Sequence, residues 1–261
     1  MNYTCVHLLF FSATDTTKGV VSAVASGLGI ENMKPYDLLR NPEAGAEIPS
    51  DELAVFGAPV YAGRIPQVAA EAMRKIKGNG TPAILVCVYG NREFDDALVE
   101  LEDIVKANNF TVVSAGAFIA QHSIFPKVAH GRPDREDLAA AVRFGKRSMA
   151  ALLAANGAEA LPEIRIRGNR PYRIPSAVPL KPRAGRKCNA CGKCARECPV
   201  HAIDAAKPSL TNNELCISCA HCIHICPVKA RKFGGLLYRI VSRKFGKKCA
   251  ARQEPYTVFP G

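Results

Sequence analysis

Short apolar runs alternate with helical patterns of hydrophobic residues along the first 155 residues of the chain. Continuous apolar runs of strand length predict buried strands, and hydrophobic positions that recur every three or four residues predict helices. The predicted strands cover residues 5–11, 32–37, 53–58, 83–89 and 111–119, and the predicted helices cover residues 17–28, 67–76, 95–108 and 134–155. This alternation is typical of an α/β fold in which a doubly wound parallel sheet carries helices on both faces.

A sheet of this kind binds ligands beyond the carboxyl ends of its strands, near the point where the strand order reverses. Five parallel strands in the order 2-1-3-4-5 would place three loops of this chain at that edge. These loops follow the strands predicted for residues 5–11, 53–58 and 83–89. Their candidate ligand-binding residues are Ser12, Ala13, Thr14, Asp15, Thr16, Thr17, Pro59, Val60, Tyr61, Ala62, Gly63, Tyr89, Gly90, Asn91, Arg92 and Phe94.

The first loop places hydroxyl groups and free backbone amides at the start of a predicted helix, which is the chemistry of a phosphate site. Its sequence, Ser-Ala-Thr-Asp-Thr-Thr, resembles the flavodoxin phosphate loop at every position but one, because Asp15 stands where that family usually has glycine. A carboxylate repels a phosphate, although aspartate tolerates the left-handed backbone better than most residues. Two interpretations stay open: the loop binds the phosphate of FMN, or Asp15 only caps an empty loop.

The second and third loops each carry an aromatic ring. Tyr61 lies in a loop stiffened by proline and glycine, and Tyr89 opens the next loop. In a flavodoxin-like domain these two rings would lie against an isoalloxazine. The alternative for either tyrosine is that it packs the end of a strand against a helix. Gln121 and His122, just beyond the last predicted strand, either line the same pocket or merely end that strand.

Eight of the eleven cysteines form two nearly identical runs with the spacing Cys-x-x-Cys-x-x-Cys-x-x-x-Cys-Pro. This is the ligand spacing of bacterial two-cluster ferredoxins, in which the fourth cysteine of each run binds the cluster held mainly by the other run. Paired Cys-x-x-Cys motifs also bind zinc, but two full runs with a trailing proline favour iron and sulfur. Disulfides are disfavoured because nothing marks the chain for secretion. The resemblance implies one 4Fe-4S cluster on Cys188, Cys191, Cys194 and Cys226, and another on Cys216, Cys219, Cys222 and Cys198.

Charge divides the chain where the cysteine content does. Residues 1–155 carry 15 Lys and Arg against 17 Asp and Glu, a net charge of −2, whereas residues 156–261 carry 20 against 6, a net charge of +14. Part of this surplus compensates the clusters, and the rest favours an acidic redox partner such as a flavodoxin, a ferredoxin or an oxidoreductase. No nucleic-acid-binding motif accompanies it. Without a signal peptide or a membrane-spanning apolar run, we expect a cytoplasmic protein in a reducing cell such as an anaerobe.

Two further segments flank the cysteine runs. Residues 158–187 contain five prolines and several arginines, which predicts either an extended strap that packs on the first domain or a simple spacer. The C-terminal tail combines many basic residues with an apolar stripe at helical spacing, formed by Leu236, Leu237, Ile240, Val241 and Phe245. This tail packs on the ferredoxin domain, docks an acidic partner or lies on an anionic membrane. The predicted domains are 1–157, 158–187, 188–230 and 231–261.

Over nearly its full length the chain resembles flavodoxin–ferredoxin fusion proteins, sometimes called ferrodoxins. The segments PVYAGRIP, YGNREFDDAL and GNRPY and the doubled cysteine run carry this resemblance. It implies a flavodoxin-like domain with FMN and a small α+β ferredoxin domain with two 4Fe-4S clusters, relaying electrons to an external protein. Two other functions stay open: an FMN-dependent oxidoreductase that reduces a small molecule with electrons from the clusters, and a redox sensor or assembly subunit with an inactive flavin site.

Overall fold

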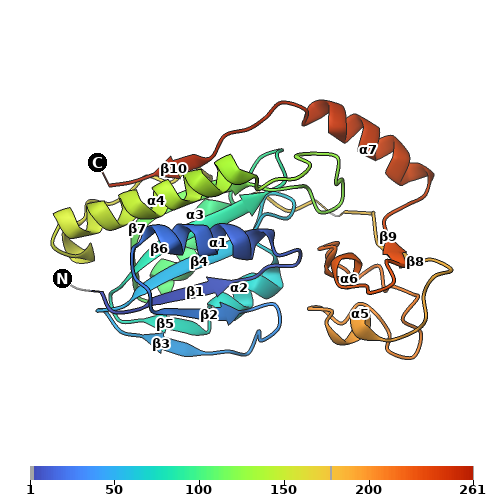
Figure 1. Ribbon diagram of the computed structural model, residues 1–261, viewed down its shortest axis with the longest axis horizontal. Helices are drawn as coiled ribbons and strands as arrows, with labels where there is room; N and C mark the ends of the chain where they lie inside the picture. Colours follow the sequence, from blue (N-terminus) through green and yellow to red (C-terminus); the bar gives the residue numbers. More distant parts are fainter. Residues whose placement is uncertain (1–2, 177, 261) are drawn as a thin grey trace.

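The computed structural model describes residues 3–176 and 178–260 of the chain. A sheet flanked by helices forms the larger part, and the cysteine-rich unit lies beyond one end of this sheet (Figure 1). The last helix and strand then run back from the cysteine-rich unit to the edge of the sheet. The two parts are therefore joined by chain segments before and after the cysteine runs.

The central sheet confirms the predicted doubly wound fold. Its parallel strands follow the order β2-β1-β4-β6-β7, which is the flavodoxin-like order 2-1-3-4-5, and β10 pairs antiparallel with β7 at the edge. The four strands predicted from apolar runs and the short second strand expected at residues 32–37 are all present. Their bounds are Val6–Phe10 for β1, Met33–Asp37 for β2, Leu53–Pro59 for β4, Thr81–Tyr89 for β6, Phe110–Ile119 for β7 and Tyr256–Val258 for β10.

Helices cover both faces of this sheet because its central strands are buried on both sides. α1 (Thr16–Gly27) and α4 (Arg135–Ala154) pack on one face, and α2 (Gln67–Met73) and α3 (Ala97–Ala107) pack on the other. Alternate residues of β1 enter the two opposing cores, as the two-residue repeat of a strand dictates. Within the part of the chain that the structure describes, no helix combines the length and the hydrophobicity needed to cross a membrane.

Short elements complete the chain. β3 pairs with β5, β8 pairs with β9, and η1 is a single 3-10 turn after α4. In the cysteine-rich unit, α5 and α6 are single-turn helices, one within each cysteine run. The bounds are Ala46–Ile48 for β3, Ile76–Gly78 for β5, Ala158–Ala160 for η1, Arg183–Ala184 for β8, Lys193–Arg196 for α5, His221–His224 for α6 and Arg231–Lys232 for β9.

The proline-rich segment packs along the first domain. Ile164 and Ile166 are buried in the same apolar core as α3. Arg170 forms ion pairs with two carboxylates of α3, at 2.8 Å from Glu102 and 2.6 Å from Asp103. The segment is therefore a strap fixed to the sheet domain, because apolar and charged contacts both hold it there.

Asp96, beside the N-terminus of α3, anchors the same strap. Its carboxylate accepts hydrogen bonds from the backbone N–H groups of Asn169 at 2.8 Å and Arg173 at 2.7 Å. Burial acts to raise the pKa of Asp96, but the hydrogen bonds from Arg173 and Asn169 outweigh it and leave this pKa below its usual value. An ionised carboxylate thus holds the backbone of the strap in place.

The C-terminal tail forms α7 (Leu236–Lys248) and β10. The phenol of Tyr238 donates a hydrogen bond to the backbone oxygen of Ile124 at 3.1 Å. The ring centroid of Phe245 lies 4.8 Å from that of Phe125. One face of α7 therefore packs against the loop that follows β7, and β10 then completes the sheet.

Replacing Asp96 with Asn should loosen the strap. We expect Asp96→Asn to lower the free energy of unfolding by about 1.5–3 kcal/mol, because hydrogen bonds to a charged group contribute about that much. Urea unfolding of the full chain measures the change. Asp51→Asn, at an exposed carboxylate, is the matched control and should stay within about 0.5 kcal/mol of the wild type. Equal stability of the two variants would show that other contacts hold the strap.

Candidate functional site

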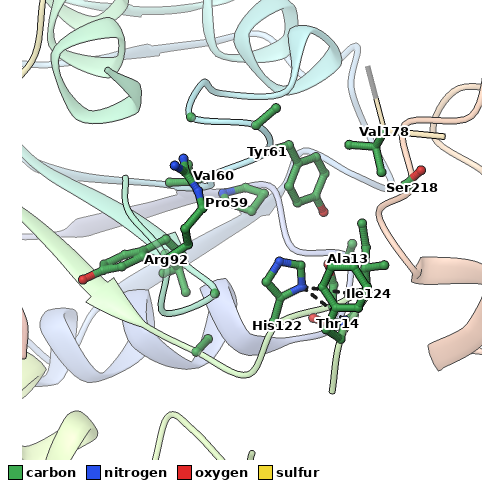
Figure 2. A pocket seen from close by; sticks show the side chains of 18 of the residues that line it. Ala13, Thr14, Pro59, Val60, Tyr61, Arg92, His122, Ile124, Val178 and Ser218 are labelled. Atoms are coloured by element: carbon green, nitrogen blue, oxygen red, sulfur yellow. Dashed lines mark hydrogen bonds between the residues drawn. The ribbon is translucent and has the colours of Figure 1, made fainter. Parts of the chain in front are cut away.

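The loops that follow β1, β4 and β6 meet around one cavity of about 330 Å³. Figure 2 shows Tyr61, His122 and Ser218 around this cavity. Its volume lies at the lower end of the range for ligand pockets, roughly 300–1,000 Å³. The predicted residues that line it are Ala13, Thr14, Thr16, Thr17, Pro59, Val60, Tyr61, Ala62, Gly63, Tyr89, Gly90 and Arg92.

The first loop divides its side chains between the cavity and other partners. Ser12 lies outside the lining, and its Oγ accepts a hydrogen bond from the backbone N–H of Lys18 at 3.1 Å. Asp15 also lies outside the lining, with a left-handed backbone at φ 60° and no hydrogen bond from its side chain to the start of α1. Asp15 therefore occupies the N-cap position of α1, but its side chain makes no capping hydrogen bond. Its carboxylate instead lies 2.9 Å from Nε2 of His224 in α6.

Asn91 and Phe94 lie behind the third loop, outside the cavity lining. The buried amide of Asn91 donates hydrogen bonds to the backbone oxygens of Cys249 at 2.9 Å and Ala251 at 2.8 Å. Phe94 is buried, and its ring centroid lies 5.2 Å from that of Tyr256 in β10. Both residues therefore attach the C-terminal segment to the loop that borders the cavity.

Tyr61 stands on a tight turn closed by a pair of backbone hydrogen bonds. Its N–H donates to the oxygen of Arg64 at 2.9 Å, and the N–H of Arg64 donates back at 3.1 Å. Gly63 makes the turn at φ 85°, where a Cβ would lie 2.5 Å from an oxygen of Asp95. Burial raises the pKa of the Tyr61 phenol well above its usual value, and the nearby thiol of Cys219 acts in the same direction. The phenol therefore keeps its proton near pH 7. Tyr61 lines the cavity together with Ile217 and Ser218 of the second cysteine run.

Tyr89, the last residue of β6, also lines the cavity. Its ring packs edge-on against Phe94, with 5.8 Å between the ring centroids. Burial raises the pKa of Tyr89 to about 12, and the carboxylate of Glu93 acts in the same direction. Tyr89 thus serves the apolar core and the cavity wall at once.

Several segments that the sequence analysis did not assign to this cavity complete its wall. Gln121 and His122, which the sequence left undecided, both line it. The other contributions come from the loop after β7, the strap, the second cysteine run and α7, all of which are distant from the first three loops in sequence. These residues include Ala120, Ser123, Ile124, Phe125, Arg173, Ser176, Val178, Ile217, Ser218 and Phe245.

His122 has a fixed ring tautomer. Its Nδ1 accepts hydrogen bonds from the backbone N–H groups of Ile124 at 3.1 Å and Phe125 at 3.3 Å, so the ring proton lies on Nε2. Burial lowers the pKa of His122 to about 4, and the positive charge of Arg92 acts in the same direction. The imidazole is therefore neutral near pH 7 and offers one N–H donor at the cavity wall.

Cysteines from both runs share one small pocket. Cys198, the last cysteine of the first run, lines this pocket together with Cys216, Cys219 and Cys222 of the second run. Cys219 and Cys222 are buried. This grouping joins the fourth cysteine of one run to three cysteines of the other, and an all-sulfur donor set suits an iron-sulfur cluster.

Arg231 brings positive charge to cysteines of both runs. Its guanidinium lies 3.8 Å from Sγ of Cys194, and Sγ of Cys226 accepts a hydrogen bond from the N–H of Ala230 at 3.2 Å. Burial acts to raise the pKa of Cys226, but backbone N–H groups and the charge of Arg231 outweigh it and lower this pKa. These surroundings favour the thiolate of Cys226, which is the form of cysteine that binds metal, whereas burial raises the pKa of Cys194 despite the charge of Arg231.

Acid should destabilise the fold through His122. An unperturbed histidine has a pKa of about 6.5, so the unfolded chain binds a proton here before the folded chain does. Stability from the neutral ring is present above about pH 6.5 and is lost as the pH falls toward the folded pKa of about 4. We expect a loss on the order of 2–3 kcal/mol across this window, which His122→Asn should abolish.

Urea unfolding across this pH range, on the wild type and on His122→Asn, measures the effect of His122. His130→Asn is the control because His130 is exposed. Its profile should follow the wild type. If the wild type and His122→Asn lose stability in parallel, the buried ring is not the acid-sensitive group.

The cysteine-rich unit matches a known family. The family model described as a 4Fe-4S binding domain matches residues 186–204, which hold the four cysteines of the first run. The chain therefore contains a 4Fe-4S ferredoxin-type domain. No curated protein matches the chain.

Solved structures similar to the chain include flavodoxins and an oxidoreductase. A flavodoxin from Streptococcus pneumonia TIGR4 is 14% identical over 57% of this chain and 99% of that chain, with a TM-score of 0.39. The Fusobacterium nucleatum flavodoxin bound to flavin mononucleotide is 19% identical over 42% and 68%, with a TM-score of 0.31. An NAD(P)H:quinone oxidoreductase from Methanothermobacter marburgensis is 16% identical over 55% and 96%, with a TM-score of 0.34. From its own strand order and its 4Fe-4S binding domain, the chain combines a flavodoxin-like α/β domain with a ferredoxin-type domain, the organisation of a flavodoxin–ferredoxin fusion.

Proposed function

We propose that this chain is an electron-transfer protein in which FMN exchanges electrons with two 4Fe-4S clusters, and the clusters exchange electrons with an external protein. FMN, when bound, takes up one or two electrons, and each cluster carries one. The cavity suits FMN in its donor groups. Thr14, Thr16 and Thr17 offer hydroxyls at the start of α1 for a phosphate, and His122 offers a neutral N–H donor farther along the wall.

The wall shared by the cavity and the second cysteine run carries this proposal. Ile217 and Ser218 line the cavity, and the next residue, Cys219, is buried in the apolar core of the sheet domain. Tyr61 packs against this core from the side of the cavity. Electron tunnelling weakens exponentially with distance, so a direct contact between the two cofactor sites favours transfer between them. A chain whose halves worked independently would not need this contact.

The number of clusters follows from the two complete cysteine runs. We assign Cys198 to the cluster of the second run because it lines the same pocket as Cys216, Cys219 and Cys222. By the same interlocking rule, Cys226 completes the cluster of the first run. The second-run cluster would then adjoin the cavity, which Ile217 and Ser218 line and to which none of the described residues of the first run contributes.

The outer face of α7 is our candidate for docking the external protein. Leu236 and Ile240 are 66% and 47% exposed, and Arg243 and Lys247 follow at helical spacing on the same side. No acidic residue occurs in this helix. A basic face with an apolar centre suits an acidic redox protein, because complementary charge speeds the encounter and apolar contact holds the complex.

Loss of the second-run cluster should disconnect the flavin. We expect Cys198→Ala to lose the cluster of the second run and, at saturating FMN, its flavin to be reduced on the order of tenfold or more slowly by a reduced acidic ferredoxin. Anaerobic stopped-flow spectroscopy follows the bleaching of the flavin, and iron analysis counts the cluster. Cys5→Ala, at a buried cysteine directly before β1 and outside both runs, is the control and should behave as the wild type.

Two outcomes would contradict this account. Flavin reduction at the wild-type rate in Cys198→Ala would show that electrons bypass the second run. Loss of the first-run cluster alone would refute the interlocked assignment, since Cys198 would then bind within its own run.

Salt should slow the exchange with an acidic partner. The screening length shrinks to about 8 Å at physiological ionic strength, so attraction between the basic face of α7 and an acidic protein weakens. Reversing the charges at Arg239, Arg243, Lys247 and Lys248 should reproduce that slowing without changing iron or flavin content. Stopped-flow exchange with an acidic flavodoxin at rising salt measures both effects. If the exchange rate changes neither with salt nor with charge reversal, the partner docks on another surface.

A further inference from the structure

Two hydrogen bonds join the phosphate loop to the second cysteine run, although their partners lie more than 200 residues apart. Nδ1 of His221 lies 2.9 Å from the backbone oxygen of Ala13. Nε2 of His224 lies 2.9 Å from the carboxylate of Asp15. Both histidines belong to α6, the single-turn helix that contains Cys222. The loop expected to bind a phosphate is thus held from outside by the ferredoxin half.

His221 connects a cluster ligand directly to this loop. A carbonyl oxygen only accepts, so Nδ1 of His221 carries the proton and donates it to Ala13. In the sequence, His221 follows Cys219 by two residues and directly precedes Cys222, and both are cysteines of the second run. The His221 side chain is buried, with 3% of its surface exposed. One buried residue of the second cysteine run therefore hydrogen-bonds the backbone of the phosphate loop.

Asp15, which departs from the flavodoxin pattern, takes part in the same junction. Asp15 has the left-handed backbone conformation that glycine usually adopts. Its side chain, which a glycine would lack, places its carboxylate against His224 of α6. A second cavity of about 470 Å³ lies here, with Thr14 and Thr16 on one side and His224 and Lys232 on the other. His224 thus holds the carboxylate of Asp15 at α6, and Lys232 brings a positive charge to the wall of the same cavity.

From these contacts we propose that α6 completes the FMN phosphate site, so that the ferredoxin half sets the affinity of the loop for the cofactor. His221 and His224 act as positioning residues, because each fixes the loop without lining the flavin cavity. Loading of the second-run cluster orders α6, and an ordered α6 holds the loop. FMN affinity and loading of this cluster are therefore coupled, and the coupling is reciprocal. This inference rests on the proposed function only in that the chain binds FMN and a cluster.

A double-mutant cycle tests the contact between Asp15 and His224. Asp15→Gly keeps the left-handed backbone, and His224→Ala removes the other partner. We expect each to weaken FMN binding by about tenfold, and the double variant to be no weaker than either, because they break one interaction. Fluorescence titration of the full, anaerobically purified chain with FMN gives the dissociation constants, and iron analysis verifies cluster content. His130→Ala, at an exposed histidine of the sheet domain, is the control and should bind as the wild type.

A pair of cysteine variants tests the coupling to the cluster. Cys216→Ala removes a ligand of the second-run cluster, and Cys191→Ala removes a ligand of the first-run cluster only. We expect Cys216→Ala to weaken FMN binding by about tenfold and Cys191→Ala to leave the dissociation constant within about twofold of the wild type. If Cys216→Ala does not fold, as judged by far-UV circular dichroism, the cycle on Asp15 and His224 decides alone.

The outcomes separate this inference from the proposed function. Tighter FMN binding by Asp15→Gly, or an unchanged dissociation constant in His224→Ala with full iron content, would overturn the inference while the carrier function stands. Equal effects of the two cysteine variants would also overturn it, because the coupling would then not run through α6. Absence of any FMN binding by the wild type would instead refute the proposed function itself.

Discussion

The contact between α6 and the loop after β1 is the constraint on which the arrangement of the molecule depends. Electron transfer between two cofactors requires that their separation be short and constant, and neither half of the chain fixes that separation alone. His221 and His224 join Ala13 and Asp15 across this boundary. Cys219 lies in the core of the sheet domain beside the same boundary. The cysteines of the second run and the walls of the cavity therefore form one continuous packed region.

Attachments on both sides of the cysteine runs keep this contact in place. Before the runs, the strap is fixed to α3 by Asp96 and by Arg170. After the runs, α7 contributes Phe245 to the cavity wall and β10 becomes a strand of the sheet. A single flexible tether would leave the cysteine-rich unit free to sample many orientations, and each docking event would cost the entropy of ordering it. With two fixed connections, the cysteine-rich unit loses this entropy once, when the chain folds.

The sequence predicted the parts of this fold that local patterns encode. Apolar runs located four of the five parallel strands, residues 32–37 were expected as a short second strand, and the spacing of the cysteines located the 4Fe-4S domain. Long-range pairing carries no such signal. The three residues of β10 are too short to be recognised as a strand, and their partner β7 lies far away in the chain. The sequence flagged Asp15 as a departure from the flavodoxin pattern, but only the structure shows that His224 is its partner. His122 was undecided for a similar reason, because its environment depends on Phe245 and Arg92 as well as on its own loop.

The central claim is that a flavin and an iron-sulfur cluster occupy adjacent sites across this boundary. Anomalous diffraction at the iron absorption edge, from crystals of the anaerobically purified chain, tests it most directly. The account predicts two iron sites per chain, the nearer one on Cys198, Cys216, Cys219 and Cys222, and flavin density in the cavity beside Tyr61 and His122. A single iron site, a zinc signal at the cysteine runs, or an iron site nearest the cavity on the other four cysteines would contradict it.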